Sequence, residues 1–374
     1  NPQIISLAAG FVDLQSLPIR ATGEAVHEIF ETSGEARKVL QYGTTIGDHK
    51  LRSLLIRSLE RQEGAAEGAF AEAVDRTVIT TGSAQLIYLL CEALLDEGDI
   101  VLVESPTYFV FLGPVETRGA RAIRVPIDDQ GLRLDALEST FQDLERQGLL
   151  DRVKFVYTIP EHANPTGISL AGDRRGPLVE LVRRWSKKHR IFLLEDAAYR
   201  GLTFDGIEPP TLWGYDRDGE TVIHARTFSK TFSPGLKTGY GILPKSLVQP
   251  IVDLKGNHDF GSSNFNQNIL AHAIEAGKYD QQIETLVGVY RSKRDVFLQA
   301  LDQYFGTLRP EVSWTSPKGG LFVWMTVPPD VDTGFEGSLF QKCLAEGVIY
   351  VPGEFAFAPE PNPVPRNQMR LSFG

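Results

Sequence analysis

A lysine set among hydroxyl residues is the part of this chain best suited to covalent chemistry. Lys230 follows Thr227 and Ser229, and a Pro-Gly bend and a second cation, Lys237, come soon after it. The segment lies past an apolar, strand-like run and carries few charges, so burial would lower the pKa of the Lys230 amine and make it nucleophilic. The two hydroxyl groups and Lys237 suit a phosphate bound beside that amine. The pattern therefore predicts a buried Schiff-base lysine next to a phosphate.

Two further polar segments follow strand-like runs. Asp196 comes directly after the mostly apolar run 191–195, and Tyr199 lies three residues further on. A carboxylate in this position can keep the ring nitrogen of a cofactor protonated, but an aspartate there can also be a helix cap or a solvated turn residue. Asn164 opens the tetrapeptide Asn-Pro-Thr-Gly, which by itself is equally compatible with a plain turn. Their common position after a strand makes these residues candidates, because ligands of α/β sheets bind beyond the strand ends.

Other segments offer groups that bind anions or rings. Ser83 and Ala84 stand where a strand-like run gives way to a helix, and helix N-terminal amides with a hydroxyl form a phosphate site. A serine helix cap without a ligand is the alternative interpretation. Arg370 could grip a carboxylate through two parallel bonds, although most arginines are surface residues or structural ion pairs. Tyr108 is either a core residue or an aromatic residue that stacks on a ring.

These motifs occur in order along nearly the whole chain, and the sequence resembles the pyridoxal phosphate (PLP) enzymes of fold type I in the class I/II aminotransferase family. The resemblance implies that Lys230 carries PLP as a Schiff base and moves the α-proton of the substrate. It implies that Asp196 faces the pyridine nitrogen, while Tyr199 and Asn164 bond the phenolic oxygen of the cofactor from opposing sides. It also implies that Arg370 binds the substrate carboxylate, with Asn164 beside it.

The resemblance assigns the remaining candidates to the cofactor as well. The phosphate-binding positions are Ser83, Ala84, Thr227, Ser229 and Lys237. Tyr108 matches the aromatic residue that stacks on the PLP ring, and Tyr42 matches a tyrosine that reaches the phosphate of the neighbouring subunit. A homodimer with shared active sites is therefore implied. Two positions depart from the family, because Ala84 replaces a usual polar residue and Lys237 replaces the usual arginine, which loses its two-pronged grip on the phosphate.

Apolar strand-like runs alternate with amphipathic segments over residues 45–255, which predicts an α/β fold with a mostly parallel seven-stranded sheet between helices. The expected strands are 77–80, 100–103, 122–126, 153–158, 191–194, 222–225 and 239–243. After about residue 256, long helices precede short strands at 320–326, 348–351 and 369–373, which predicts a smaller α+β domain. We therefore expect an N-terminal arm (1–30) that packs with the small domain, a large PLP-binding domain (31–255) and a small C-terminal domain (256–374).

Composition narrows the class of protein further. The net charge of −10 argues against nucleic-acid binding, and no apolar run approaches the roughly 20 residues that span a membrane. Cys91 and Cys343, the only two cysteines, indicate no disulfide framework. His27 and Glu28 lack the second histidine of a zinc-protease helix, so we expect no metal. A cytoplasmic enzyme of small molecules is expected, and the start at Asn1 without a methionine leaves room for a preceding segment.

The function expected from the resemblance is transfer of an amino group from an α-amino acid to a 2-oxo acid in two half-reactions. The pattern looks most like the branch with aromatic, 2-aminoadipate, kynurenine and branched-chain aminotransferases, and it leaves the side-chain specificity open. Two alternatives remain. One is another PLP reaction on the same scaffold, such as elimination, cyclisation or oxidation, and the other is an effector-binding module of a transcription regulator. His162, two residues before Asn164, is expected to be a surface or structural residue.

Overall fold

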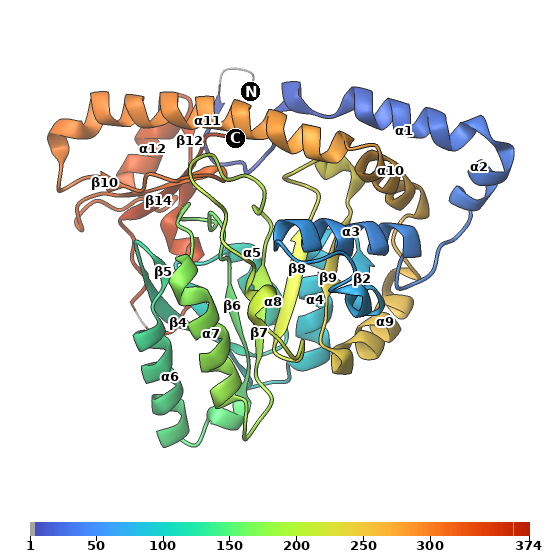
Figure 1. The fold of residues 1–374 in the computed structure, drawn as a ribbon. Helices are drawn as coiled ribbons and strands as arrows, with labels where there is room; N and C mark the ends of the chain where they lie inside the picture. Colours follow the sequence, from blue (N-terminus) through green and yellow to red (C-terminus); the bar gives the residue numbers. More distant parts are fainter. Residues whose placement is uncertain (1–3, 362) are drawn as a thin grey trace.

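An eight-stranded sheet is the central feature of the computed structural model, which describes residues 4–361 and 363–374 (Figure 1). In spatial order its strands are β2 (Thr77–Thr80), β9 (Gly239–Ile242), β8 (Val222–Thr227), β7 (Phe192–Asp196), β6 (Val153–Thr158), β3 (Ile100–Ser105), β4 (Arg121–Asp128) and β5 (Gly131–Leu132). The four pairs from β8 to β4 are parallel, whereas β9 is antiparallel to both of its neighbours, so β2 points the same way as the parallel strands. Each of the seven expected strands is present, and β5 adds a short antiparallel edge.

Helices cover both faces of this sheet. One face is covered by α4 (Gly82–Leu94), α5 (Phe109–Thr117) and α9 (Lys245–Asp259), and the other by α3 (His49–Gln62), α6 (Leu134–Arg146), α7 (Gly172–Trp185) and α8 (Leu212–Tyr215). Successive residues of β3 belong to different cores, since Val101 and Val103 pack with α4 and α5, whereas Ile100 and Leu102 pack with α3, α6 and α7. A sheet buried on both faces is the α/β arrangement that the sequence predicts.

A second lobe contains a four-stranded antiparallel sheet. Its order is β10 (Ser313–Trp314), β11 (Phe322–Thr326), β14 (Gln368–Ser372) and β13 (Val351–Pro352). A separate parallel pair joins β1 (Ile5–Ser6) to β12 (Val348–Ile349), so the N-terminal segment adds a strand to this lobe. The expectation of one strand over 348–351 is wrong, because the chain changes partners at Tyr350. The Tyr350 side chain is buried and donates to the Thr333 carbonyl oxygen, which holds the chain at this change.

Further helices run along the top of the view in Figure 1 and down its right side. They are α1 (Ile19–Glu31), α2 (Ser33–Val39), α10 (Asn264–Glu275) and α11 (Lys278–Phe305), and α12 (Ser338–Ala345) lies with the second lobe. Helix α1 packs on α10, which in turn packs on α3 of the large sheet. The domain boundaries near residues 30 and 255 stay a prediction. Within the described residues, no helix has both the length and the apolar character needed to cross a bilayer.

Gly239 allows the sheet to meet the first turn of α4. A Cβ atom at this position would lie 2.7 Å from three backbone atoms: the Arg226 carbonyl oxygen, the Gly82 carbonyl carbon and the Ser83 nitrogen. Backbone atoms of a paired strand and of a helix start cannot move aside without shifting the whole element. Gly239 therefore sets how closely the β8–β9 pair approaches the start of α4.

We expect Gly239→Ala to destabilise the protein by about 1–3 kcal/mol, because the added methyl group forces backbone atoms apart. Gly288→Ala is the matched control, since Gly288 lies exposed on α11 and, apart from its chain neighbours and the backbone of its own helix, no heavy atom of the described residues lies within 4 Å of its would-be Cβ. There alanine should stabilise the helix by up to about 1 kcal/mol. Denaturant unfolding measures both free energies, and equal stability of the two variants would contradict the close approach.

Candidate active site

A cavity of about 160 Å³ lies at the edge of the large sheet where the parallel strands end. The carboxyl ends of β2, β3, β6, β7 and β8 share this edge, and the antiparallel β9 begins there. The cavity is lined by Thr81, Gly82, Ser83, Ala84, Tyr108, Ile159, Asn164, Asp196, Ala198, Tyr199, Thr227, Ser229, Lys230 and Lys237. These residues come from the ends of five strands and the loops beyond them. Ligands of open α/β sheets bind at this edge.

Lys230 lies in the turn that follows β8. Its amine donates a 2.8 Å hydrogen bond to the Gly10 carbonyl oxygen of the N-terminal segment. Burial lowers the pKa of Lys230, and the positive charges of Arg370 and Lys237 lower it further. A lowered pKa leaves more of the amine unprotonated, which is the form that attacks a carbonyl carbon.

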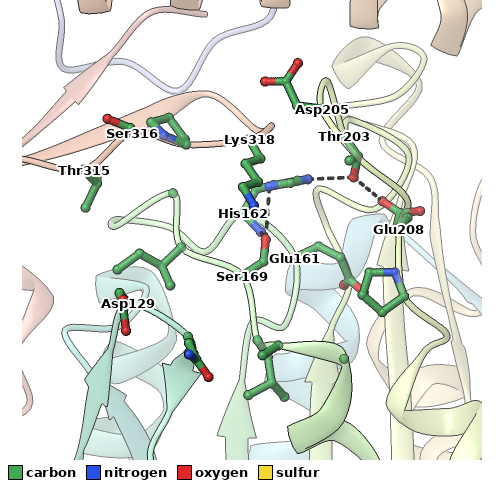
Figure 2. A pocket seen from close by; sticks show the side chains of 18 of the residues that line it. Asp129, Glu161, His162, Ser169, Thr203, Asp205, Glu208, Thr315, Ser316 and Lys318 are labelled. Atoms are coloured by element: carbon green, nitrogen blue, oxygen red, sulfur yellow. Dashed lines mark hydrogen bonds between the residues drawn. The ribbon is translucent and has the colours of Figure 1, made fainter.

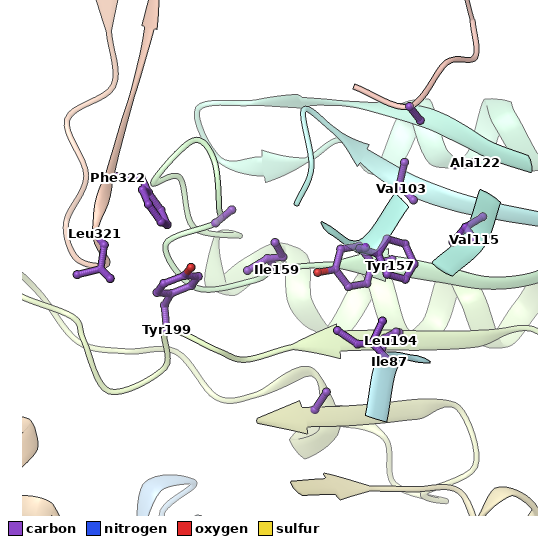
Figure 3. Packing of buried hydrophobic residues seen from close by; sticks show 14 of the residues in the cluster. Ile87, Val103, Val115, Ala122, Tyr157, Ile159, Leu194, Tyr199, Leu321 and Phe322 are labelled. Atoms are coloured by element: carbon purple, nitrogen blue, oxygen red, sulfur yellow. The ribbon is translucent and has the colours of Figure 1, made fainter. Parts of the chain in front are cut away.

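Asp196, the last residue of β7, is 3% exposed. Its Oδ2 accepts a 2.8 Å hydrogen bond from the hydroxyl of Tyr157 on β6, whereas its Oδ1 is buried without a partner among the described residues. Figure 3 shows Tyr157 within a cluster of buried apolar residues. Burial raises the pKa of Asp196 to about 6 and that of Tyr157 well above its ordinary value. An unpaired buried carboxylate oxygen is costly, so it indicates a donor that a ligand supplies, such as a protonated ring nitrogen.

Tyr199 and Asn164 present neutral groups to the cavity. The Tyr199 ring packs edge to face on Phe322, with ring centroids 5.8 Å apart, and Figure 3 shows the two rings side by side. Burial raises the pKa of Tyr199 above its ordinary value, although the neighbouring Asn164 side chain opposes this shift. The hydroxyl therefore stays protonated and able to donate. Tyr108 precedes α5 at the same cavity, and burial raises the pKa of Tyr108 to about 12.

Arg370 lies on β14 of the second lobe and reaches the site through Asn164. Its guanidinium donates to the Asn164 Oδ1 at 2.8 Å and to the Ala8 carbonyl oxygen at 2.6 Å. Its Nε is buried and has no partner within the described part of the chain. The guanidinium carbon lies 4.4 Å from the centre of the Phe322 ring, and burial lowers the pKa of Arg370. A buried guanidinium with a free donor indicates an anionic ligand.

The start of α4 and the end of β8 offer donors for a phosphate. Gly82, at φ +75°, turns the chain into α4, and no side chain caps this helix start. The hydroxyl oxygens of Thr227 and Ser229 lie 2.9 Å apart. Lys237, at φ +47°, ends the short turn before β9 in a left-handed conformation and lines the cavity. Uncapped helix amides, hydroxyl groups and a cation are together typical of a phosphate site.

Basic side chains outnumber acidic ones around the cavity. Lys230 and Lys237 line it and Arg370 lies beside it, whereas Asp196 is the one carboxylate among the described lining residues. A phosphate and a substrate carboxylate would supply the missing negative charge. This donor set, together with the unpaired Asp196 Oδ1, fits PLP.

The structure brings most of the expected site residues together. Ten of the twelve line this one cavity: Ser83, Ala84, Tyr108, Asn164, Asp196, Tyr199, Thr227, Ser229, Lys230 and Lys237. Arg370 joins them through Asn164. Tyr42 lies elsewhere, 81% exposed, with its ring 5.4 Å from that of Phe260. The roles of these residues toward a cofactor stay a prediction.

Two contacts of the site carry no signal in the sequence. Tyr157 occupies an ordinary inward position of β6, and only the pairing of β6 with β7 brings its hydroxyl to Asp196. The contact of Gly10 with Lys230 uses a backbone carbonyl group, which every residue possesses. Neither contact could be deduced from residue type or spacing.

The fold and the site define a PLP-binding enzyme of the α/β class, and comparison with known proteins gives its family. The family model described as aminotransferase class I and II matches residues 2–373. The chain belongs to this family. Its cofactor is PLP, and it is an aminotransferase, so the fold class, the cofactor and the type of enzyme expected from the sequence are confirmed.

Relatives and solved structures agree with this assignment. Aromatic-amino-acid aminotransferase 1 of Thermococcus litoralis is 33% identical over 99% of this chain and 83% of its own length. The 2-aminoadipate transaminase of Thermus thermophilus is 33% identical over 100% of this chain and 86% of its own length. The crystal structure of Pyrococcus horikoshii kynurenine aminotransferase, in complex with PMP, superposes with a TM-score of 0.89 at 32% identity, covering 99% of this chain and 86% of that one.

Asp196→Asn tests how much the buried carboxylate destabilises the cofactor-free protein. The pKa of Asp196 is about 6 in the folded state against an ordinary 3.8, so the folded protein binds the proton more tightly. The stability that this proton contributes is therefore present below about pH 4 and is lost as the pH rises to about 6. We expect the asparagine variant to be more stable than wild type by about 1–3 kcal/mol at pH 8, and not at pH 4.

Denaturant unfolding of the cofactor-free proteins at both pH values measures this difference. Asp330→Asn is the control, because Asp330 is exposed and its replacement should change neither value. A stability difference between Asp196→Asn and wild type that does not vary with pH would contradict the cost of the buried charge.

Proposed function

We propose that the protein transfers the amino group of an α-amino acid to a 2-oxo acid in two half-reactions, with Lys230 as the covalent and proton-transferring residue. The observation that carries this proposal is one cavity that contains both an unpaired, buried Asp196 Oδ1 and a lysine of lowered pKa. Bound PLP supplies an electron sink for the negative charge that develops at the substrate Cα. Family membership supports transamination over other reactions of the same scaffold.

The residues of the chain orient and tune the cofactor. Asp196 accepts the ring N–H on Oδ1 and keeps that nitrogen protonated, while Tyr157 fixes Oδ2 and so sets the direction of the carboxylate. Tyr199 and Asn164 bond the phenolic oxygen, and Tyr108 covers the ring. The backbone amides at the start of α4, including that of Ala84, bind the phosphate. The hydroxyl groups of Ser83, Thr227 and Ser229 and the ammonium group of Lys237 complete this site.

The same chain binds the substrate and moves its proton. Arg370 binds the α-carboxylate, since it is 4% exposed and keeps a free donor at Nε. Asn164, already bonded to Arg370, ties the substrate site to the cofactor site. Lys230 would leave the Gly10 carbonyl oxygen, take the proton from the substrate Cα as a base and deliver it as an acid to the cofactor carbon that bears the amino group, and the second half-reaction would run these transfers backwards.

We propose large α-amino acids as donors, and aromatic ones first. The names of the relatives, which specify aromatic amino acids, 2-aminoadipate and kynurenine, support this class. Within the chain, the rings of Phe322 and Phe109 lie 4.4 and 5.4 Å from the guanidinium carbon of Arg370. An apolar wall beside the carboxylate-binding group favours an apolar side chain on the substrate.

Adding an amino acid without any 2-oxo acid tests the proposed reaction. The visible band of lysine-bound PLP in the wild type should bleach with a competent donor. Lys230→Ala should lose this covalent link and slow the conversion by roughly 10²- to 10⁴-fold or more, because the base at Cα is removed. Lys187→Ala, at an exposed position, should behave as wild type.

A donor panel of aromatic, 2-aminoadipate, branched-chain and small amino acids resolves the substrate class in the same assay. Release of ammonia with return of the visible band would show elimination or oxidation and overturn transamination. A wild-type protein that acquires no visible band with added PLP would overturn the whole proposal.

We further propose that two chains form a homodimer with shared active sites. An apolar patch supports this, since Leu40, Tyr42 and Phe260 are each more than half exposed. The patch adjoins the site, because Ser262 lines the same surface hollow as Leu40, Tyr42 and Phe260, and its hydroxyl lies 3.3 Å from that of Thr81, which lines the cavity. Exposed apolar side chains beside a functional cavity are typical of an interface. The two free cysteines support a reducing, cytoplasmic location.

Mixing inactive subunits tests whether Tyr42 serves the partner site. Tyr42→Ala and Lys230→Ala should each be impaired, but a mixed dimer contains one intact site, formed by Lys230 of one chain and Tyr42 of the other. Random reassociation of equal amounts should therefore restore about a quarter of wild-type activity. Lys230→Ala mixed with Asp196→Asn should restore no activity. Each residue serves the site of its own chain, so both sites of the mixed dimer are defective. No recovery in the first mixture would overturn the shared site.

A further inference from the structure

Both ring nitrogens of His162 are engaged by neighbouring side chains (Figure 2). Nδ1 lies 3.1 Å from the Ser169 Oγ, and Nε2 lies 2.8 Å from the Thr203 Oγ1. The Thr203 hydroxyl donates in turn to Glu208 at 2.9 Å. Because the Thr203 proton points to Glu208, the Thr203 oxygen accepts from Nε2–H, and Nδ1 accepts from the Ser169 hydroxyl. A neutral imidazole with its proton on Nε2 satisfies these contacts, and it has no nitrogen left for a ligand.

Packing gives the His162 ring one position. The residue is 3% exposed, and burial lowers the pKa of His162 to about 4, so the ring stays neutral. Its φ of +47° is a left-handed conformation that is uncommon outside glycine. The second lobe closes over it, because a Cβ atom at Gly319 would overlap the ring, and one at Gly320 would lie 2.6 Å from the His162 Cβ. The neighbouring side chains and the backbone of the second lobe therefore fix the orientation of the His162 ring.

The His162–Thr203 hydrogen bond joins the two loops that carry Asn164 and Tyr199. His162 precedes Asn164 by two residues, and Thr203 follows Tyr199 by four. The loops follow different strands, β6 and β7, and both Asn164 and Tyr199 line the cofactor cavity. Arg200 adds a second link between the same loops, since it donates to the Glu161 carboxylate at 3.0 Å. Of the two links, the His162 contact lies nearer in sequence to Asn164.

We propose that His162 is a positioning residue which, through Thr203, sets the spacing of Asn164 and Tyr199 around the phenolic oxygen of PLP. This inference rests on the proposed function. Two donors from separate loops can bond one oxygen only if both lie near 2.6–3.2 Å from it, and hydrogen bonds weaken steeply beyond such distances. A hydrogen bond between two neutral side chains, one on each loop, maintains that spacing without adding a charge to the site.

The spacing has a spectroscopic consequence. Hydrogen bonds from Asn164 and Tyr199 draw charge away from the phenolic oxygen, which otherwise helps to retain the proton on the lysine nitrogen of the bound cofactor. Well-placed donors therefore lower the pH at which that proton is lost and the visible band changes. Misplaced donors should raise this pH midpoint, whereas a general loss of stability has no reason to move it.

Thr203→Val and Thr203→Ser form the test pair, because Thr203 touches the His162 ring but does not line the cofactor cavity. In the PLP-loaded protein, Thr203→Val should raise the pH midpoint of the visible band by about half a unit to one unit, and Thr203→Ser should keep the wild-type midpoint. His162→Gln, whose amide can still donate toward Thr203, should fall between the two. It also provides the measurement if Thr203→Val does not fold.

Asn164→Ala is the positive control, since it removes one of the two donors outright. A raised midpoint in Asn164→Ala with an unchanged midpoint in Thr203→Val and His162→Gln would overturn the positioning role and leave the proposed function intact. Lower thermal stability of Thr203→Val with a wild-type midpoint would also overturn the positioning role, because the His162–Thr203 hydrogen bond would then serve stability alone. A wild-type protein without a visible band would instead remove the proposed function itself.

Discussion

Buried charged groups that the protein leaves without an opposite charge are the constraint on which the rest of the structure depends. Asp196 has one oxygen held by Tyr157 and one without a partner, and Arg370 has a buried Nε without a partner in the described chain. Taking such groups out of water costs free energy, and pairing them with each other would remove that cost. A site paired in this way would have to break its own ion pairs before binding a ligand. Keeping the groups fixed and unpaired prepares them for ligand charges instead.

Neutral backbone groups bind the basic side chains of the site in the ligand-free protein. The carbonyl oxygens of Ala8 and Gly10 accept hydrogen bonds from Arg370 and Lys230, and β1 anchors this segment to β12 of the second lobe. A carbonyl dipole binds a cation less strongly than a carboxylate does, so it orients the cation and still yields to an incoming anion. The N-terminal segment thus links the small lobe to the reactive groups of the large sheet.

Much of this arrangement could be predicted from local pattern. Runs of apolar residues mark strands because both faces of the sheet are buried, and the ends of the expected strands 77–80 and 153–158 agree with the structure. Polar residues directly after such runs, such as Asp196, fall at the shared edge of parallel strands. The apolar pattern wrongly predicts one strand over 348–351, where the chain passes from one sheet to another at Tyr350. A change of partner leaves the local apolar pattern unaltered, so local pattern could not show it.

The sequence by itself determined which chemical groups stand at the ends of the strands, and the ends of parallel strands meet at one edge by geometry. Only the tertiary structure decided which groups touch: Tyr157 with Asp196, Arg370 with Asn164 across 206 positions of the chain, and Gly10 with Lys230. The physical reason is that such contacts depend on strand order and on how the two lobes dock. Both follow from the packing of the whole chain, and no short segment contains that information.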